Sequence, residues 1–362
     1  MNILTVNCGS SSIKYKLYSF PKGEMINRGL IEKIGEKSSS IANHTQGMKK
    51  LFHNLLKEKA IDNLEEIDAI GHRVVHGGET FREPHRIDNE VIKKIKECSK
   101  LAPLHNPANL AGIRACTKIL SQITQIAVFD TAFHHTIPEH AYMYAIPIKY
   151  YRRHKIRRYG FHGTSHQFVA MRAAQILKRS LTGLNLITCH LGNGCSITAI
   201  KRGKAIDTSM GFTPLEGLIM GSRCGDVDVA AILYLMEKEK LSIRQIDEVL
   251  NKRSGLLGIS GISNDVRTIK EQIKKRNKFA KLALDMFTYR IKKYIGAYWL
   301  ILGGADAICF TAGIGENNPD IISQIKKDIS TQIGKKTKVL VIPTDEEFMI
   351  ASLTYELLRK LS

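Results

Sequence analysis

The feature that most constrains the fold is a structural unit that the sequence contains twice. The unit consists of an apolar strand, a turn of small residues and a hairpin. Its first copy spans residues 3–20, with the turn at 7–12, and its second copy spans residues 184–205, with the turn at 190–194. In both copies the residues after the turn alternate between apolar and polar, which is typical of strands with one buried face. The repetition predicts two domains of the same architecture.

The rest of the chain mixes further strands with helices. Apolar runs predict strands over residues 67–75, 123–129, 307–311 and 339–342. Apolar residues at helical spacing predict helices over residues 89–101, 226–237, 242–250 and 279–302. Thr344 precedes a last helix, and Glu347 follows three residues later, as in a capping box. This mixture indicates an α/β protein.

The length and composition are typical of a soluble globular protein. The 362 residues suffice for two domains with separate cores, and 43% of them are hydrophobic. The most apolar window, 295–310, contains Gly303, Gly304 and Asp306 and is too short to span a membrane. The N-terminus lacks the features of a signal peptide, and the seven cysteines include no CxxC pair. We therefore expect a cytoplasmic protein with free thiols.

The net charge of +20 raises the question of a nucleic-acid or membrane partner. The lysines are spread over the whole chain, and the densest basic run, 152–158, is short and isolated. We therefore interpret the charge as a solvated surface and expect neither nucleic acid nor membrane as a partner. Such a surface would also attract anionic substrates, an effect that decreases with salt.

Three small-residue turns are candidate phosphate sites. They lie at residues 7–12, 190–194 and 313–317, each directly after an apolar strand. Tight turns of glycine and serine direct several backbone N–H groups to one point, which is how proteins hold phosphate. Any one of them could be only a tight turn, and three together are stronger evidence. The sequence contains neither the GxxxxGK[ST] loop nor the HRD and DFG motifs, which excludes those phosphotransfer families.

Four cationic and acidic residues are further candidates for the site. Arg73 and Asp130 each stand at the end of a predicted strand, and His162 and Arg223 lie in glycine-containing loops. Phosphoryl transfer to a carboxylate brings two anions together, and arginine, histidine and metal ions neutralise the charge between them. Taken singly, an arginine here could be a surface ion pair, and the histidine and aspartate could be structural.

Ten segments, found in this order along nearly the whole chain, are similar to motifs of the acetate kinase family. They are NCGSSSIK (7–14), GHRVVHGGE (71–79), APLHNP (102–107), FDTAFH (129–134), YGFHGTSH (159–166), HLGNG (190–194), DTSMGFTPLEG (207–217), SGLLGISG (254–261), FTAGIGEN (310–317) and IPTDEE (342–347).

The resemblance implies the fold of the acetate and sugar kinase, Hsp70 and actin group. That fold has two duplicated actin-like ATPase domains with ribonuclease H-like βββαβαβα cores, and ATP lies in the cleft between them. The first domain would comprise 1–136 with the last helix, 345–362, and the second would comprise 137–344. A homodimer is also implied.

The resemblance further implies reversible, Mg²⁺-dependent, direct in-line transfer from ATP to acetate, giving acetyl phosphate and ADP. The resemblance also implies that Mn²⁺ can replace Mg²⁺. Asn7 and Glu346 would place the metal, although from the residues alone Glu346 suits the first turn of a helix. The alternatives are a propionate or butyrate kinase of the same family, and a non-catalytic nucleotide-binding module of the actin/Hsp70 type. The latter has no use for Arg73, His162 and Arg223 together.

The resemblance implies a role for each remaining site residue. Arg73 would hold the substrate carboxylate or phosphoryl group, His162 and Arg223 would stabilise the transition state, and Asp130 would orient a group, because acetate needs no base. The acyl pocket would be formed by Val75, Leu104, Phe161 and Pro214. The nucleotide would be bound by Ser10, Ser12, Lys14, His190, Leu191, Gly192, Asn193, Gly194, Asp265, Val266, Arg267, Gly313, Ile314, Gly315, Glu316 and Asn317.

The sequence also departs from the family pattern. Val266 replaces a residue that is often aromatic in the family, which would loosen adenine packing. Val229 replaces a common proline, and the chain is shorter than a typical member. Cys8 lies inside the motif 7–14 and Cys224 inside a further active-site motif, 220–226, so thiol-modifying reagents are expected to inhibit.

Overall fold

The structure, a computed structural model, describes residues 1–103, 105–334 and 336–361. It divides into two compact units. The first contains Met1–His135, Gly163–Ser165 and the segment that begins at Asp345, and the second contains Thr136–His162 and His166–Thr344. The sequence prediction had placed residue 136 in the first domain and residues 163–165 in the second.

The first unit is built on one mixed sheet with the strand order β3-β2-β1-β4-β6-β5. The strands are β1 (Asn2–Cys8), β2 (Ile13–Ser19), β3 (Glu24–Ile31), β4 (Ala69–Val74), β5 (His85–Arg86) and β6 (Thr124–Phe129). Strands β1, β2 and β3 pair antiparallel, whereas β4 is parallel to both β1 and β6.

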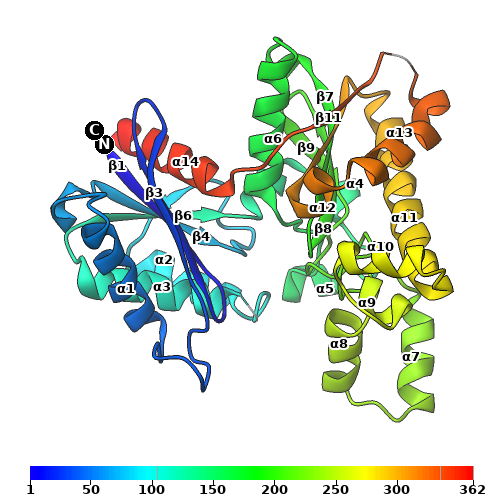
Figure 1. Ribbon diagram of the computed structural model, residues 1–362, viewed down its shortest axis with the longest axis horizontal. Coiled ribbons are helices and arrows are strands. Elements are labelled where there is room, and N and C mark those ends of the chain that lie inside the picture. The colour runs from blue at the N-terminus through cyan, green and yellow to red at the C-terminus, as the bar shows by residue number, and fades with distance from the viewer. Residues whose placement is uncertain (104, 335, 362) are drawn as a thin grey trace. The chain divides into compact units, whose positions relative to one another are not determined.

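Helices cover both faces of this sheet (Figure 1). Helix α14 (Glu346–Leu361) packs on one face, where its Ile350 contacts Ile126 and Val128. Helices α1 (His44–Lys57), α2 (Asn89–Cys98) and α3 (Asn106–Ile119) lie on the other face. Short 3-10 turns are formed by Leu64–Glu66 and Ala132–Thr136.

The approach of α14 to the sheet depends on a glycine in strand β4. A Cβ atom at Gly71 would lie 2.5 Å from Thr354 Oγ1 and 2.8 Å from Ile350 Cγ2. Distances below about 3 Å are not tolerated without movement of the helix. The glycine therefore allows α14 to approach the sheet closely.

The second unit repeats the strand arrangement of the first, in the order β9-β8-β7-β10-β11. Its strands are β7 (Asn185–Leu191), β8 (Cys195–Lys201), β9 (Lys204–Thr208), β10 (Ala307–Thr311) and β11 (Lys338–Val341). Strands β7, β8 and β9 pair antiparallel, and β10 is parallel to β7 and β11. This matches β3-β2-β1-β4-β6 strand for strand, so the predicted α/β class and its duplication are confirmed.

Ten helices and one 3-10 turn, Leu181–Gly183, belong wholly or mainly to the second unit as described. They are α4 (Glu139–Tyr142), α5 (Lys149–His154), α6 (Gly163–Ile176), α7 (Val229–Lys238), α8 (Ile243–Lys252), α9 (Gly255–Ser260), α10 (Val266–Lys274), α11 (Lys278–Leu302), α12 (Ala312–Asn317) and α13 (Pro319–Ile333). Helix α11 packs against β7 and β8 and buries Phe287, Ile291 and Ile295. In the described part of the chain, no helix has the length and apolarity needed to cross a membrane.

Two local predictions were wrong. Residues 313–317 were predicted as a tight turn, but they lie in the short helix α12. Glu316 Oε1 there accepts the Ala312 N–H at 2.7 Å, so the carboxylate satisfies a backbone donor at the helix start. Thr344 was predicted to cap α14, but Asp345 Oδ1 accepts the Phe348 N–H at 2.9 Å instead. Glu347, the expected partner in the capping box, forms an ion pair with Lys14 at 2.9 Å.

Candidate functional site

The turn after strand β1 is held from two sides. Within the turn, the Gly9 N–H donates to Ser12 O at 2.9 Å. From helix α3, Asn109 Nδ2 donates to Cys8 O at 2.9 Å. Ser10 is exposed and Ser12 is half-buried, so both hydroxyls can be reached by a ligand. The Lys14 ammonium group, on β2, is about half exposed and bound to Glu347.

Arg73 gathers three acceptors from separate segments of the first unit. Its guanidinium binds Asp130 at two points, with Nε 3.1 Å and Nη2 2.5 Å from Oδ2. Its Nη1 donates to Asn7 Oδ1 at 3.3 Å, and its Nε lies 3.8 Å from Glu346 Oε2. Burial lowers the pKa of Arg73, but Asp130 and Glu346 outweigh that effect, so the net shift is upward. Four predicted site residues are thus in contact.

The carboxylates in this group have different surroundings. Asp130 is fully buried and accepts a hydrogen bond from Thr164 Oγ1 at 3.1 Å. Burial raises the pKa of Glu346 to about 7; Asp130 and Glu347 add to the shift, and Arg73 opposes it. The Glu346 carboxylate is therefore an unfavourable charge that a cation would stabilise.

Two asparagines that were not assigned roles hold the segment after β4. Asn109 Oδ1 accepts the Val75 N–H at 3.1 Å, and Asn106 Oδ1 accepts the His76 N–H at 3.1 Å. Both asparagines are buried. Asn106 belongs to the motif 102–107, which was the available signal. Val75 is buried, whereas Leu104, also predicted for the acyl pocket, lies outside the described residues.

In the second unit, the side chains of His162 and Arg223 meet over Gly194. A Cβ atom at Gly194 would lie 3.4 Å from both His162 Nε2 and Arg223 Nη1. The His162 ring stacks on His190, with 4.2 Å between the ring centroids. His162 precedes helix α6 in a left-handed conformation, with φ +58°. Glycine at position 194 therefore leaves room for an anion beside the imidazole and the guanidinium.

Arg223 has no carboxylate partner among the described residues. Its Nη1 donates to Pro214 O at 3.1 Å and lies 3.7 Å from Met220 Sδ. Burial lowers the pKa of this guanidinium, because a charge in low-dielectric surroundings is costly. Buried charges are normally paired, so this arginine is suited to an anionic ligand.

The loop that carries Pro214 is held by a half-buried group of polar side chains centred on Glu216. Arg158 Nη2 donates to Glu216 Oε1 at 2.6 Å, and the Tyr144 hydroxyl donates to Glu216 Oε2. The Tyr144 oxygen also accepts the Phe212 N–H at 2.8 Å. Sequence reasoning missed these residues, although Glu216 lies within the motif 207–217.

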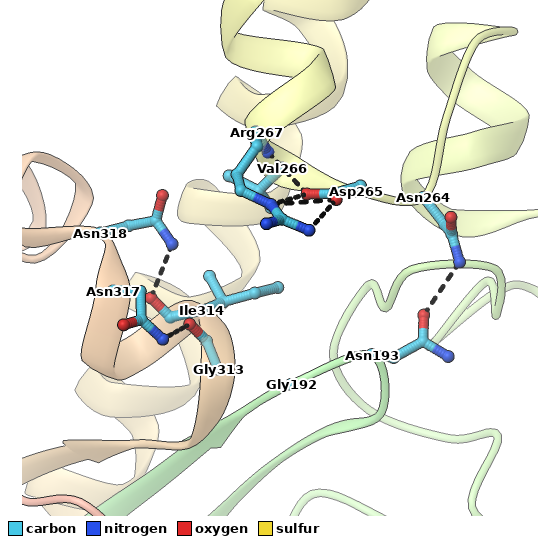
Figure 2. Close-up of a pocket in the computed structure, with 10 residues that line it drawn as sticks. All are labelled: Gly192, Asn193, Asn264, Asp265, Val266, Arg267, Gly313, Ile314, Asn317 and Asn318. Carbon is cyan, nitrogen blue, oxygen red and sulfur yellow. Dashed lines mark hydrogen bonds and ion pairs between the residues drawn. The ribbon is translucent and has the colours of Figure 1, made fainter. Parts of the chain in front are cut away.

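A cavity of about 520 Å³ lies entirely within the second unit (Figure 2). Among its lining residues Asp265 binds Arg267, with Oδ2 2.7 Å from Nη2, and Asn264 Nδ2 donates to Asn193 Oδ1 at 3.2 Å. Its volume is within the usual range of small-molecule sites, about 300–1,000 Å³. The cavity is lined by Gly192, Asn193, Asn264, Asp265, Val266, Arg267, Gly313, Ile314, Asn317 and Asn318.

The structure brings together only part of the predicted nucleotide set. Eight predicted residues line the cavity, whereas His190, Leu191, Gly194, Gly315 and Glu316 are not among the lining residues. Asn264 and Asn318 line it without having been predicted, and each directly follows or precedes a predicted residue in the sequence. Ser10, Ser12 and Lys14 belong to the first unit.

A family model described as the acetokinase family matches residues 2–331. The chain belongs to the acetokinase family. The resemblance inferred from the ten motifs is therefore confirmed.

Individual members of the acetokinase family match over their full length. The acetate kinase of Halothermothrix orenii is 50% identical, covering 97% of this chain and 98% of the relative. The crystal structure of Porphyromonas gingivalis acetate kinase has 45% identity and a TM-score of 0.93, with 99% of each chain covered. A propionate kinase from Francisella tularensis has 40% identity and a TM-score of 0.91, covering 97% of this chain and 98% of its own.

Proposed function

We propose that the chain catalyses reversible phosphoryl transfer between ATP and acetate, giving ADP and acetyl phosphate. The observation that carries the proposal is the half-buried Arg223, which has no carboxylate partner among the described residues and lies with His162 over Gly194. These two groups would stabilise the charge that develops on the transferring phosphoryl group. Family membership supports the same reaction.

Arg73 would bind the carboxylate or the phosphoryl group. Asp130 holds this guanidinium at two points, which fits an orienting role for the aspartate. Acetate is already ionised at neutral pH, so no general base is needed, and transfer can be direct. Product formation in this scheme requires no covalent intermediate with Asp130.

The oxygen atoms near Arg73 fit Mg²⁺, which prefers carboxylate and carbonyl oxygens. Asn7 Oδ1 and the Glu346 carboxylate would hold the ion. The raised pKa of Glu346, caused first by burial, marks a place where a cation is favoured. When bound, Mg²⁺ would neutralise charge on the phosphate oxygens. Mn²⁺ takes similar oxygen ligands and would substitute.

The cavity of the second unit would bind ATP or ADP. Its glycine-containing segments at Gly192 and Gly313 leave backbone groups accessible, and Arg267 adds a cation. Val266 is buried and presents only an aliphatic surface to a base. We therefore expect weak discrimination between adenine and guanine nucleotides.

Propionate is the second candidate substrate, because the compared relatives include a propionate kinase. Of the proposed acyl pocket, Val75 and Phe161 are buried and Pro214 is half-buried. One methylene group in such a pocket changes discrimination by about 1–3 kcal/mol. Propionate should therefore be a slower substrate.

A homodimer and a cytoplasmic location complete the proposal. The second unit exposes large apolar side chains on three helices, namely Val229, Leu233, Tyr234, Ile243, Phe279, Tyr289 and Leu300. Exposed apolar residues mark an interface where they form one contiguous patch, and these residues are the candidates for such a patch. All seven cysteines are free thiols, which suits a reducing compartment. Sedimentation analysis of the purified protein would test the dimer.

The central test is a steady-state assay with MgATP in which hydroxylamine traps the acyl phosphate. Acetate, propionate and butyrate are compared for the wild type, Arg223→Ala and the control Arg253→Ala, an exposed arginine 3.6 Å from Glu248. We expect strong acetate turnover that only Arg223→Ala abolishes. Preference for a longer acid would change the substrate but keep the mechanism. No acyl phosphate from any acid, with ATP still bound, would favour a non-catalytic nucleotide-binding module.

A further inference from the structure

A chain of hydrogen bonds leads from His162 into the sheet of the second unit. His162 Nδ1 lies 2.9 Å from Ser196 Oγ, which lies 2.8 Å from His166 Nε2. His166 Nδ1 lies 2.7 Å from Thr188 Oγ1, and this hydroxyl reaches Thr198 O at 3.5 Å. Ser196, His166 and Thr188 are fully buried. Bulk water is therefore excluded from these three side chains of the hydrogen-bond chain.

The Thr198 carbonyl at the inner end determines which atom donates in each of these hydrogen bonds. A carbonyl oxygen can only accept, so the Thr188 hydroxyl donates to it and accepts from His166 Nδ1–H. In a neutral imidazole the other nitrogen is then an acceptor. His166 Nε2 accordingly accepts the Ser196 hydroxyl proton, and Ser196 Oγ accepts from His162 Nδ1–H.

We propose that Ser196 and His166 are positioning residues: they hold the His162 ring by its Nδ1–H and so direct Nε2 to the phosphoryl group, to which Nε2 donates once the imidazole is protonated. Nε2 is the ring atom that lies over Gly194, next to Arg223. The hydrogen bond at one ring nitrogen of a histidine determines the role of the other. Ser196 already accepts from Nδ1, so a proton added at Nε2 makes both nitrogens donors without rearranging the chain. The inference rests on the proposed role of His162.

The tautomers can be measured by NMR of the whole protein labelled with ¹⁵N-histidine. Signals are assigned with His162→Gln and His166→Gln. We expect neutral His162 to carry its proton on Nδ1. Thr188→Val removes the acceptor for His166 Nδ1–H, so the proton of neutral His166 moves to Nε2. Ser196 then accepts from His166 and donates its own proton to His162 Nδ1. The proton of neutral His162 therefore moves to Nε2 as well.

The matched control is Thr208→Val, which removes a buried hydroxyl of the same sheet outside the chain. We expect it to leave the His162 tautomer unchanged. A purely structural role for Thr188 predicts the same result for both variants.

Kinetics provide a second readout. Ser196→Ala should lower kcat about 10–100-fold, as is usual for residues that orient a reacting group, with the KM for ATP within about twofold. Ser196→Thr restores the hydroxyl and should recover most of kcat.

An unchanged His162 tautomer in folded Thr188→Val, or wild-type His162 protonated on Nε2 alone, would overturn the inference. Full activity of His162→Gln would instead contradict the proposed function. In that case the NMR result would still show whether Ser196 and His166 set the tautomer of His162.

Discussion

The Arg73 guanidinium joins acceptors from three separate segments of the chain, and lysine cannot reproduce this arrangement. A lysine ammonium group lacks the planar fork that binds Asp130 at two points. We expect Arg73→Lys to lower kcat/KM for acetate at least about 100-fold, equivalent to roughly 3 kcal/mol of transition-state stabilisation. Binding of ATP, measured by calorimetry, should change little. Arg86→Lys, at an exposed arginine of β5, is the control and should behave as wild type.

Glu346 makes stability depend on pH. Its pKa is raised from 4.5 to about 7 in the folded chain, chiefly by burial. The folded protein therefore holds a proton that the unfolded chain releases, so stability falls as the pH rises from about 4.5 to 7. Urea unfolding should show this decrease in the wild type but not in Glu346→Gln.

Magnesium should oppose that decrease, because only the ionised carboxylate binds a cation. The increase in unfolding free energy on adding MgCl₂ should grow between pH 6 and 8. The control is Glu356→Gln, at an exposed residue of α14, which should retain the wild-type pH profile. Equal magnesium stabilisation of Glu346→Gln and the wild type would contradict the assignment.

The two cysteines in the motifs should respond differently to alkylation. Burial raises the pKa of Cys8 to about 12 and also raises the pKa of the half-buried Cys224. The thiolate is the reactive form. We therefore expect iodoacetamide at neutral pH to modify Cys224 before Cys8, as peptide mass spectrometry would show. Inhibition that persists in Cys224→Ser but disappears in Cys8→Ser would show the opposite order.

At the scale of elements, the loop that ends at Arg223 depends on the group around Glu216. A Cβ atom at Gly211 would lie 2.8 Å from the Glu216 carboxyl carbon, so the loop needs glycine there. Glu216→Gln weakens the hydrogen bonds from Arg158 and Tyr144, which are strongest to a charged acceptor. We expect kcat to fall about tenfold, a loss of roughly 1.4 kcal/mol. A wild-type kcat in folded Glu216→Gln would contradict this role.

The contact between α14 and the sheet gives a test of packing. Gly71→Ala places a methyl group against Thr354 and Ile350, and overpacking of this kind costs about 1–3 kcal/mol. The control is Gly183→Ala, where a Cβ would meet nothing within 4 Å. Urea unfolding should show a loss for the first variant and a change within about 0.5 kcal/mol for the second.

For the whole molecule, the net charge of +20 predicts a kinetic effect of salt. A positive field accelerates the approach of anions and is screened over about 8 Å at physiological ionic strength. We expect the KM for ATP to rise between 20 and about 300 mM KCl while kcat changes little. Salt-independent KM values would limit the charge to a role in solubility.

The duplicated architecture could be predicted because its signal is local. Alternation around Gly203 and the small-residue turns directly indicated the repeated strand and hairpin. The sequence likewise singled out Arg73 and Asp130, which the structure brings into contact. Three features could not be predicted: helix α12, the cap of α14 by Asp345, and the hydrogen bonds that join His162, Ser196 and His166. Each depends on a carboxylate or hydroxyl group whose partner is brought close only by the folded backbone.

The position of α14 has a consequence for protein synthesis. The first unit begins at Met1, yet the helix that covers one face of its sheet follows Asp345. While the chain is still on the ribosome, residues 1–135 are complete long before this helix emerges. Ile126 and Val128 then have no helix to cover them, and Glu346 is absent. A nascent chain interrupted before residue 345 would therefore leave this apolar surface uncovered and would lack a proposed magnesium ligand.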